Sequence, residues 1–179
     1  PAPADETLPT LRRHWFREGL VLGGPGAAPF VLGNGIGCSL PGYREVLSGA
    51  VDPACTSNEC PPVTVPTVVG VAARRFGRGA VALVASWSGL TGALHPSELG
   101  IPLSAGRWTT TDARFRTDRA LAATVVGADF SSPFPGTGLY RPDAETAAVA
   151  LRYLEVNRPR LLVVGFGDTD EWAHQGDFA

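Results

Sequence analysis

Apolar positions in the first half of the chain predict short helices followed by a buried strand. Helical spacing of apolar side chains occurs in residues 11–17, 41–48 and 65–76, and the last two segments each run up to a glycine. Residues 80–86, AVALVAS, form an apolar run of strand length. The pattern therefore indicates helices packed against a buried strand.

The C-terminal part repeats this pattern more clearly. Residues 142–156 start with Pro, carry two acids in the first turn and continue with an apolar stripe, which predicts a helix. Residues 160–166, RLLVVGF, predict a second buried strand. We therefore predict an α/β fold, a mostly parallel sheet sandwiched between helices. In residues 89–140, rich in Gly, Ser, Thr and Pro, we expect loops and a short helix near 111–123.

Composition narrows the class of protein. The length of 179 residues suits one domain, and 44% hydrophobic residues are enough for a core. The net charge of −2 gives no electrostatic argument for binding nucleic acid or an anionic membrane, and no apolar stretch is long enough to span a bilayer. The absence of Met predicts a processed protein or a fragment. We expect the tryptophans, Trp87 among them, to be packing residues.

Three cysteines, Cys38, Cys55 and Cys60, lie close together in the sequence. They are either three buried thiols or contain a small disulfide, most simply Cys55–Cys60. A disulfide would imply an oxidising compartment, and on this basis we expect an extracytoplasmic location, periplasmic or secreted.

A polar cluster, GDTDEWAHQGD, follows the second predicted strand at residues 167–177. In a helix that starts near Asp170, the side chains of Asp170 and His174 lie on one face, one turn apart. A carboxylate and an imidazole placed in this way can share a divalent metal such as zinc. Asp168 adds another carboxylate nearby. The alternative is a polar helix cap, in which Asp168 or Asp170 binds backbone amides.

A second cluster, GNGIGCSLPGYREVLSG, covers residues 33–49 and places Ser39 just before a predicted helix. The positive end of that helix would stabilise an ionised Ser39 oxygen, and a nearby metal would do so more strongly. The alternative is that Ser39 only caps the helix.

Together the two clusters resemble the alkaline phosphatase superfamily, in the branch of nucleotide pyrophosphatase/phosphodiesterases and related bacterial phosphatases. In that branch a Ser or Thr nucleophile precedes an apolar residue, Pro and an aromatic residue, as in residues 39–43, and the following helix ends in Thr/Ser-Gly, as at residues 48–49. A later Asn matches Asn58. An acid, a spacer and Asp-x-x-x-His before Gly match residues 168–176.

The resemblance implies metal-dependent hydrolysis of phosphoric esters, monoesters or diesters, through a Ser phospho-enzyme. Ser39 would be the nucleophile, and Asn58 would donate a hydrogen bond to a phosphoryl oxygen. Asp170 and His174 would bind metal together with Ser39. The implied cofactors are two divalent ions, zinc or alternatively manganese, and the implied substrate is a small phosphate ester.

The family also has a metal-binding Asp before the nucleophile and a second Asp-His pair and a final His further along, none of which this sequence contains. We therefore expect residues 1–179 to be a single partial domain, lacking both ends and inactive alone. It would consist of a nucleophile block (33–60), a variable loop-rich region (89–140) and a metal-ligand block (160–179).

Two alternatives remain. A non-catalytic binding or scaffold domain could keep the same fold without all the metal ligands, although it would have no need of both Ser39 and Asn58. A sulfatase-like hydrolase would need a C/S-x-P-x-R motif. Counted from Ser39, Tyr43 stands where that motif has Arg; counted from Cys38, Leu40 stands where it has Pro. The sequence therefore favours a hydroxyl nucleophile.

Overall fold

The computed structural model describes residues 9–23, 28–106, 109–110 and 140–176. In chain order the elements are η1 (Leu11–Trp15), α2 (Phe16–Glu18), α3 (Ser39–Ser48), α4 (Val68–Phe76), η2 (Arg78–Ala80), β1 (Val81–Ala85), η3 (Ser88–Ala93), η4 (Pro96–Glu98), β2 (Leu103–Ala105), β3 (Thr109–Thr110), α7 (Asp143–Asn157), β4 (Leu161–Gly165) and α8 (Asp168–His174). No helix among these residues is long and apolar enough to cross a membrane.

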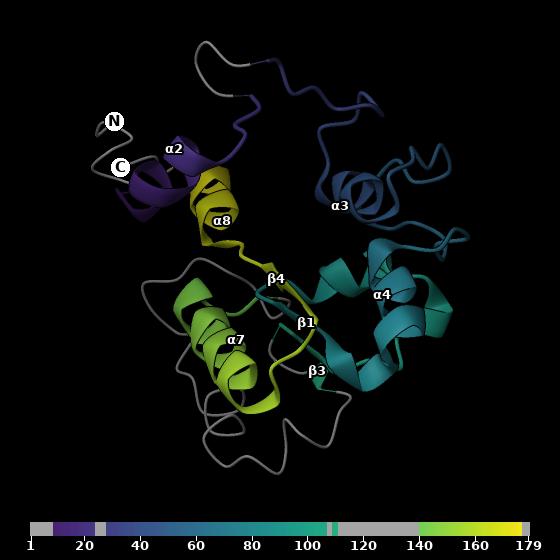
Figure 1. The fold of residues 1–179 in the computed structure, drawn as a ribbon. Coiled ribbons are helices and arrows are strands. Elements are labelled where there is room, and N and C mark those ends of the chain that lie inside the picture. The colour runs from purple at the N-terminus through teal and green to yellow at the C-terminus, as the bar shows by residue number, and fades with distance from the viewer. Residues whose placement is uncertain (1–8, 24–27, 107–108, 111–139, 177–179) are drawn as a thin grey trace.

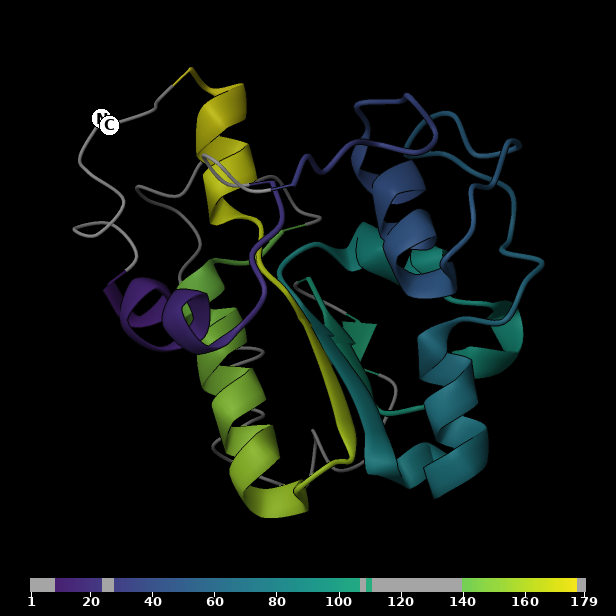
Figure 2. The ribbon, with the colours of Figure 1, turned by 45° about the horizontal axis from the view of Figure 1, so that its top comes forward.

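The strands form one sheet in the order β3-β2-β1-β4, with β1 at its centre. β1 is parallel to both β2 and β4, whereas β3 pairs with β2 in the antiparallel sense at the edge. Helix α7 covers one face of this sheet and helices α3 and α4 lie on the other (Figure 1, Figure 2). The predicted α/β class, with parallel strands between helices, is therefore confirmed for the described part of the chain.

Alternation of side chains along β1 explains why helices cover both faces. Val81, Leu83 and Ala85 belong to the core cluster shared with α3 and α4, and Ala82 and Val84 belong to the cluster shared with α7. All five side chains are fully buried. A strand buried on both faces has no polar alternation, because neither of its faces meets water.

The helix boundaries follow local signals near the predicted positions. Helix α4 starts after Thr67, whose side-chain oxygen accepts hydrogen bonds from the backbone N–H groups of Val69 and Gly70. Helix α7 starts after Pro142, which cannot donate a backbone hydrogen bond. The strands predicted at 80–86 and 160–166 are present as β1 and β4, each shortened at its ends.

Two predictions of local structure are wrong, and a third falls on residues that the structure does not describe. Helix α3 begins at Ser39 and not after it, because the turn before Pro41 is already helical. β2 and β3 lie in the region where loops were predicted; they are three and two residues long, too short to give an apolar pattern. The helix predicted near 111–123 falls on residues that the structure does not describe.

Two fully or almost fully buried arginines join the layers. The guanidinium of Arg141 donates to Thr146 Oγ1 on α7 at 2.9 Å and to Ser104 Oγ on β2 at 2.9 Å. The guanidinium of Arg44, on α3, pairs with Asp52 at 2.7 Å and donates to the carbonyl of Gly92 at 3.1 Å. Each arginine therefore ties a helix to a segment distant in the sequence.

Candidate functional site

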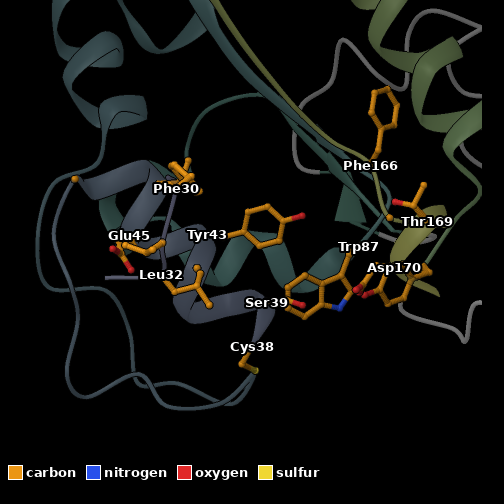
Figure 3. Close-up of a pocket in the computed structure, with 16 residues that line it drawn as sticks. Phe30, Leu32, Cys38, Ser39, Tyr43, Glu45, Trp87, Phe166, Thr169 and Asp170 are labelled. Carbon is orange, nitrogen blue, oxygen red and sulfur yellow. The ribbon is translucent and has the colours of Figure 1, made fainter. Parts of the chain in front are cut away.

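A pocket of about 800 Å³ opens where the carboxyl ends of β1 and β4 meet the start of α3 (Figure 3). Ligand sites of open α/β sheets commonly lie at this edge. Both Ser39, from α3, and Asp170, from α8, line it. The structure thus brings to one pocket Ser39, the predicted nucleophile, and Asp170, a predicted metal ligand, although the two residues are distant in the sequence.

Ser39 is the first residue of α3, and its side chain does not cap the helix. The residue at the cap position is Cys38, and its side chain makes no capping hydrogen bond. Asn58 Oδ1 instead accepts from the Leu40 backbone N–H at 2.9 Å and from the Cys38 thiol at 3.2 Å. The Ser39 hydroxyl forms no hydrogen bond with any other described residue, so the capping alternative for Ser39 is wrong.

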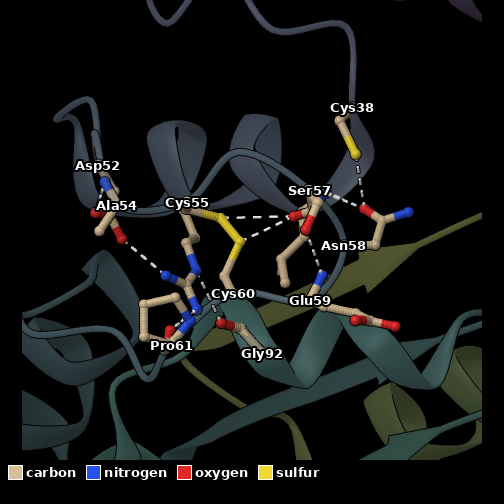
Figure 4. The surroundings of a disulfide bond; sticks show 12 residues. Cys38, Asp52, Ala54, Cys55, Ser57, Asn58, Glu59, Cys60, Pro61 and Gly92 are labelled. Atoms are coloured by element: carbon tan, nitrogen blue, oxygen red, sulfur yellow. Dashed lines mark hydrogen bonds and ion pairs between the residues drawn. A yellow bond between two sulfur atoms is a disulfide. The ribbon is translucent and has the colours of Figure 1, made fainter.

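Asn58 is carried by a short loop that a disulfide closes. Cys55 and Cys60 are bonded, and Cys38 is free. Asn58 lies between the two bonded cysteines, and its amide nitrogen points away from Cys38 (Figure 4). Of the two alternatives for the cysteines, the small disulfide is therefore the one the structure contains, and it braces the loop that reaches α3.

Helix α8 carries the predicted metal ligands one turn apart. His174 Nε2 lies 3.6 Å from Asp170 Oδ2. The side chains are 71% and 51% exposed, so both are open to solvent, and only Asp170 lines the pocket. Among the described residues, no group of three or more His, Cys, Asp or Glu side chains could hold a metal ion.

Two aspartates join the starts of α7 and α8, and one of them, Asp143, was not predicted to belong to the site. Asp143 Oδ1 accepts from the Gly167 N–H at 2.7 Å and from the Ser86 hydroxyl at 2.5 Å, and Asp143 Oδ2 accepts from the Asp168 N–H at 3.1 Å. Asp168 Oδ1 accepts in return from the Asp143 N–H at 2.9 Å. Each aspartate thus satisfies backbone donors at the start of the other one's helix.

Burial raises the pKa of Asp168, an effect that its hydrogen bond from the Asp143 backbone opposes and the Asp143 charge reinforces. Asp168 therefore fulfils the alternative expected for it, a cap that binds backbone amide, but it does so for α7 and not for its own helix. Asp143 stood in the sequence only as an acid in the first turn of a helix. No local sequence pattern indicates that Asp143 would bond Gly167 and Asp168, which lie between β4 and α8.

Three aromatic side chains, Tyr43, Trp87 and Tyr140, also line the pocket. The ring centroids of Tyr43 and Trp87 are 6.3 Å apart, and those of Trp87 and Tyr140 are 6.1 Å apart. Burial raises the pKa of Tyr43, and the nearby charges of Asp170 and Asp143 raise it further. Burial and the charge of Glu171, to which Tyr140 is hydrogen-bonded, raise the pKa of Tyr140. Both phenols therefore stay neutral at physiological pH.

Trp87 was expected to be a packing residue; the structure confirms that it packs against the core and also places it in the pocket wall. Its position directly after an apolar strand was a usable signal, because residues at the carboxyl ends of parallel strands line such sites.

Comparisons of this chain with protein-family models, with curated proteins and with solved structures gave no match.

Proposed function

We propose that this chain belongs to a metal-dependent hydrolase of phosphoric esters that acts through a phosphorylated Ser39, with a fold of the alkaline phosphatase type. The observation that carries the proposal is that Ser39 and Asp170 line one pocket although they are far apart in the sequence. A helix cap and an incidental acid would have no reason to meet there.

Ser39 is suited to nucleophilic attack by its position and by its free hydroxyl. At the N-terminus of a ten-residue helix, the positive end of the helix dipole favours negative charge. Ser39 Oγ gives its proton to water and bonds to phosphorus while the ester P–O bond breaks, and the alcohol leaves with a proton taken from water. A water molecule then attacks the phosphoserine, which releases phosphate and restores the hydroxyl.

Asn58 supports this role with the half of its amide that is still free. Its Oδ1 is used by Leu40 and Cys38, so the Nδ2 hydrogens remain to donate to a non-bridging phosphoryl oxygen. A donor near Ser39 would stabilise charge that develops in the transition state, although Asn58 is not among the described residues that line the pocket.

The donor set of α8 fits part of a zinc or manganese site. Two ligands about 2.0 Å from a tetrahedral zinc lie about 3.3 Å apart, and the Asp170 and His174 atoms are 3.6 Å apart. A divalent ion there would offset the charge of the phosphoryl group and lower the pKa of an oxygen ligand. We assign Asp170, His174 and Ser39 to it, and propose that the other ligands, and those of a second ion, come from outside the described residues.

Ser39→Ala in the full-length protein tests the nucleophile, with Ser48→Ala at the other end of α3 as the matched control. With zinc or manganese supplied, Ser39→Ala should lower turnover of phenyl phosphate by about 10³-fold or more, because the covalent step is lost. Ser48→Ala should leave turnover unchanged. If Ser39→Ala keeps most of its activity, the phospho-enzyme mechanism is wrong.

Metal binding is tested separately from turnover. Asp170→Asn and His174→Ala should each lower the zinc content of the purified protein, measured by elemental analysis, while Ser48→Ala should not. An unchanged zinc content in both variants would remove these two residues from the metal site.

The same assays separate the alternatives. A full-length protein inactive on phosphate monoesters, phosphate diesters and aryl sulfates would be a non-catalytic binding or scaffold domain. Activity on the aryl sulfate alone would indicate the sulfatase-like hydrolase. We also propose an extracytoplasmic location, which the Cys55–Cys60 disulfide supports because such bonds persist in oxidising compartments.

A further inference from the structure

The pocket is much larger than a phosphoryl group needs. Its volume of about 800 Å³ is in the range of sites that bury a whole organic ligand. Trp87 lies between Ser39 and Asp170 in the pocket wall, and Tyr43 lies near Ser39 (Figure 3). Most of this space is therefore left for the group that is esterified to the phosphate.

The aromatic wall is built next to the nucleophile. Tyr43 follows Ser39 by one helical turn, so both side chains lie on one face of α3. Trp87 follows β1 and stacks on Tyr140, with an angle of 20° between the ring planes. The two residues also form an antiparallel backbone bridge, so the stack is held by main chain as well as by ring contact.

Two glycines leave the space that these rings occupy. A Cβ atom on Gly89 would lie 2.1 Å from an atom of the Trp87 ring, and one on Gly167 would lie 2.9 Å from Cε1 of Tyr140. Any side chain at either position would push a ring out of its present place. The flat wall thus depends on the absence of side chains behind it.

The charges around the pocket disfavour an anionic leaving group. None of the described residues that line it is Arg or Lys, and two, Glu45 and Asp170, are acids. Glu45 accepts from the backbone N–H of Gly33 at 3.0 Å. Arg44, on the same helix, is buried and bound to Asp52, so its charge does not serve the pocket.

We propose that the pocket selects phosphate esters of neutral, flat, apolar alcohols, whose ring packs against Trp87 beside Ser39. This inference rests on the proposed function and names its substrate class. Esters whose leaving group carries further negative charge, such as nucleoside diphosphates, would place that charge near Glu45, away from the proposed metal site, with no Arg or Lys among the described lining residues to offset it.

Binding of three phosphonates, which cannot be hydrolysed, tests the substrate class in the full-length, zinc-loaded protein by calorimetry. Benzylphosphonate should bind about tenfold more tightly than methylphosphonate, because its ring stacks in the pocket. 4-(Phosphonomethyl)benzoate should bind several-fold more weakly than benzylphosphonate, because of its added carboxylate. Equal affinities for benzylphosphonate and methylphosphonate, tighter binding of the benzoate, or no binding of any of the three would overturn the proposal.

Variants of Trp87 then test whether the benzyl ring of the ligand packs against this side chain. Trp87→Ala should reduce the preference for benzylphosphonate to near unity, Trp87→Phe should keep most of it, and Trp15→Ala, outside the pocket, should not change it. If Trp87→Ala does not fold, Gly89→Ala is used in its place, since the added Cβ displaces the Trp87 indole ring without removing it. A preference that survives in both variants places the ring elsewhere and overturns the proposal.

The outcomes distinguish this inference from the proposed function. Ring preference without any turnover would reject the hydrolase and keep the aromatic subsite. Turnover of phenyl phosphate without ring preference would reject the subsite and keep the hydrolase.

Discussion

At the scale of single residues, the site depends on the carboxylate of Asp143, which is not one of its expected reactive groups. This side chain accepts hydrogen bonds from Gly167 and Asp168, the residues at the start of α8. Partners that hold a metal-ligand element in place commonly matter nearly as much as the ligands themselves. If Asp170 and His174 bind metal as proposed, Asp143 is a positioning residue for them.

Asp143→Ala should lower the free energy of unfolding by about 2 kcal/mol, because it leaves part-buried backbone donors without an acceptor. It should also weaken zinc binding by about tenfold or more. Asp143→Asn keeps one acceptor and should show smaller losses. Urea unfolding and metal titration measure the two effects.

Glu155→Ala, on the exposed face of the same helix, is the matched control, since the Glu155 side chain is 72% exposed. A loss of stability in Asp143→Ala with unchanged zinc affinity would mean that Asp143 supports the fold but does not position the ligands.

At the scale of elements, the N-terminus of α3 depends on a loop far along the chain. The loop closed by Cys55–Cys60 presents Asn58, which takes up the Leu40 N–H. A five-residue separation between the bonded cysteines makes the loop short, so the disulfide mainly restricts local freedom. The end of α3 that carries Ser39 is therefore capped from outside the helix.

The double variant Cys55→Ser, Cys60→Ser should lose about 2 kcal/mol of stability, the loop-closure entropy expected for so short a loop. Thermal unfolding with and without a reducing agent measures this. The reductant should destabilise the wild type by a similar amount and leave the double variant unaffected. A reductant effect of equal size in both proteins would show that the stability does not come from this disulfide.

At the scale of the whole molecule, the sheet and helix α7 are joined by the buried guanidinium of Arg141. Arg141 bonds the hydroxyl and carbonyl of Ser104, the carbonyl of Gly106 and Thr146. Burial lowers the pKa of its guanidinium to about 10, which still leaves it charged at neutral pH. These bonds fix α7, and with it Asp143, relative to β1 and β2.

Arg141→Met should lower the free energy of unfolding by about 3 kcal/mol, because several buried acceptors lose their donor at once. Arg74→Ala is the matched control, because Arg74 is exposed on α4; it should change stability by less than about 0.5 kcal/mol. Chemical unfolding followed by circular dichroism compares the two. Equal effects of both substitutions would argue against a joining role for Arg141.

The sequence by itself determined the main elements around the site. The apolar runs of β1 and β4 are visible because both faces of these strands are buried, and α3, α4 and α7 are marked by apolar spacing and by glycine or proline near their ends. The i, i+4 spacing of Asp170 and His174 also follows from the sequence, since a helix fixes it locally.

Only the tertiary structure decided which distant groups meet. β2 became a strand by pairing with β1, because its three residues are too few to carry a pattern of their own. The Asp143–Asp168 exchange, the capping of α3 by Asn58 and the aromatic wall of Tyr43, Trp87 and Tyr140 all join residues far apart in the chain. Local propensity carries no information about such pairs, because they form only where the ends of neighbouring parallel strands bring separate loops together.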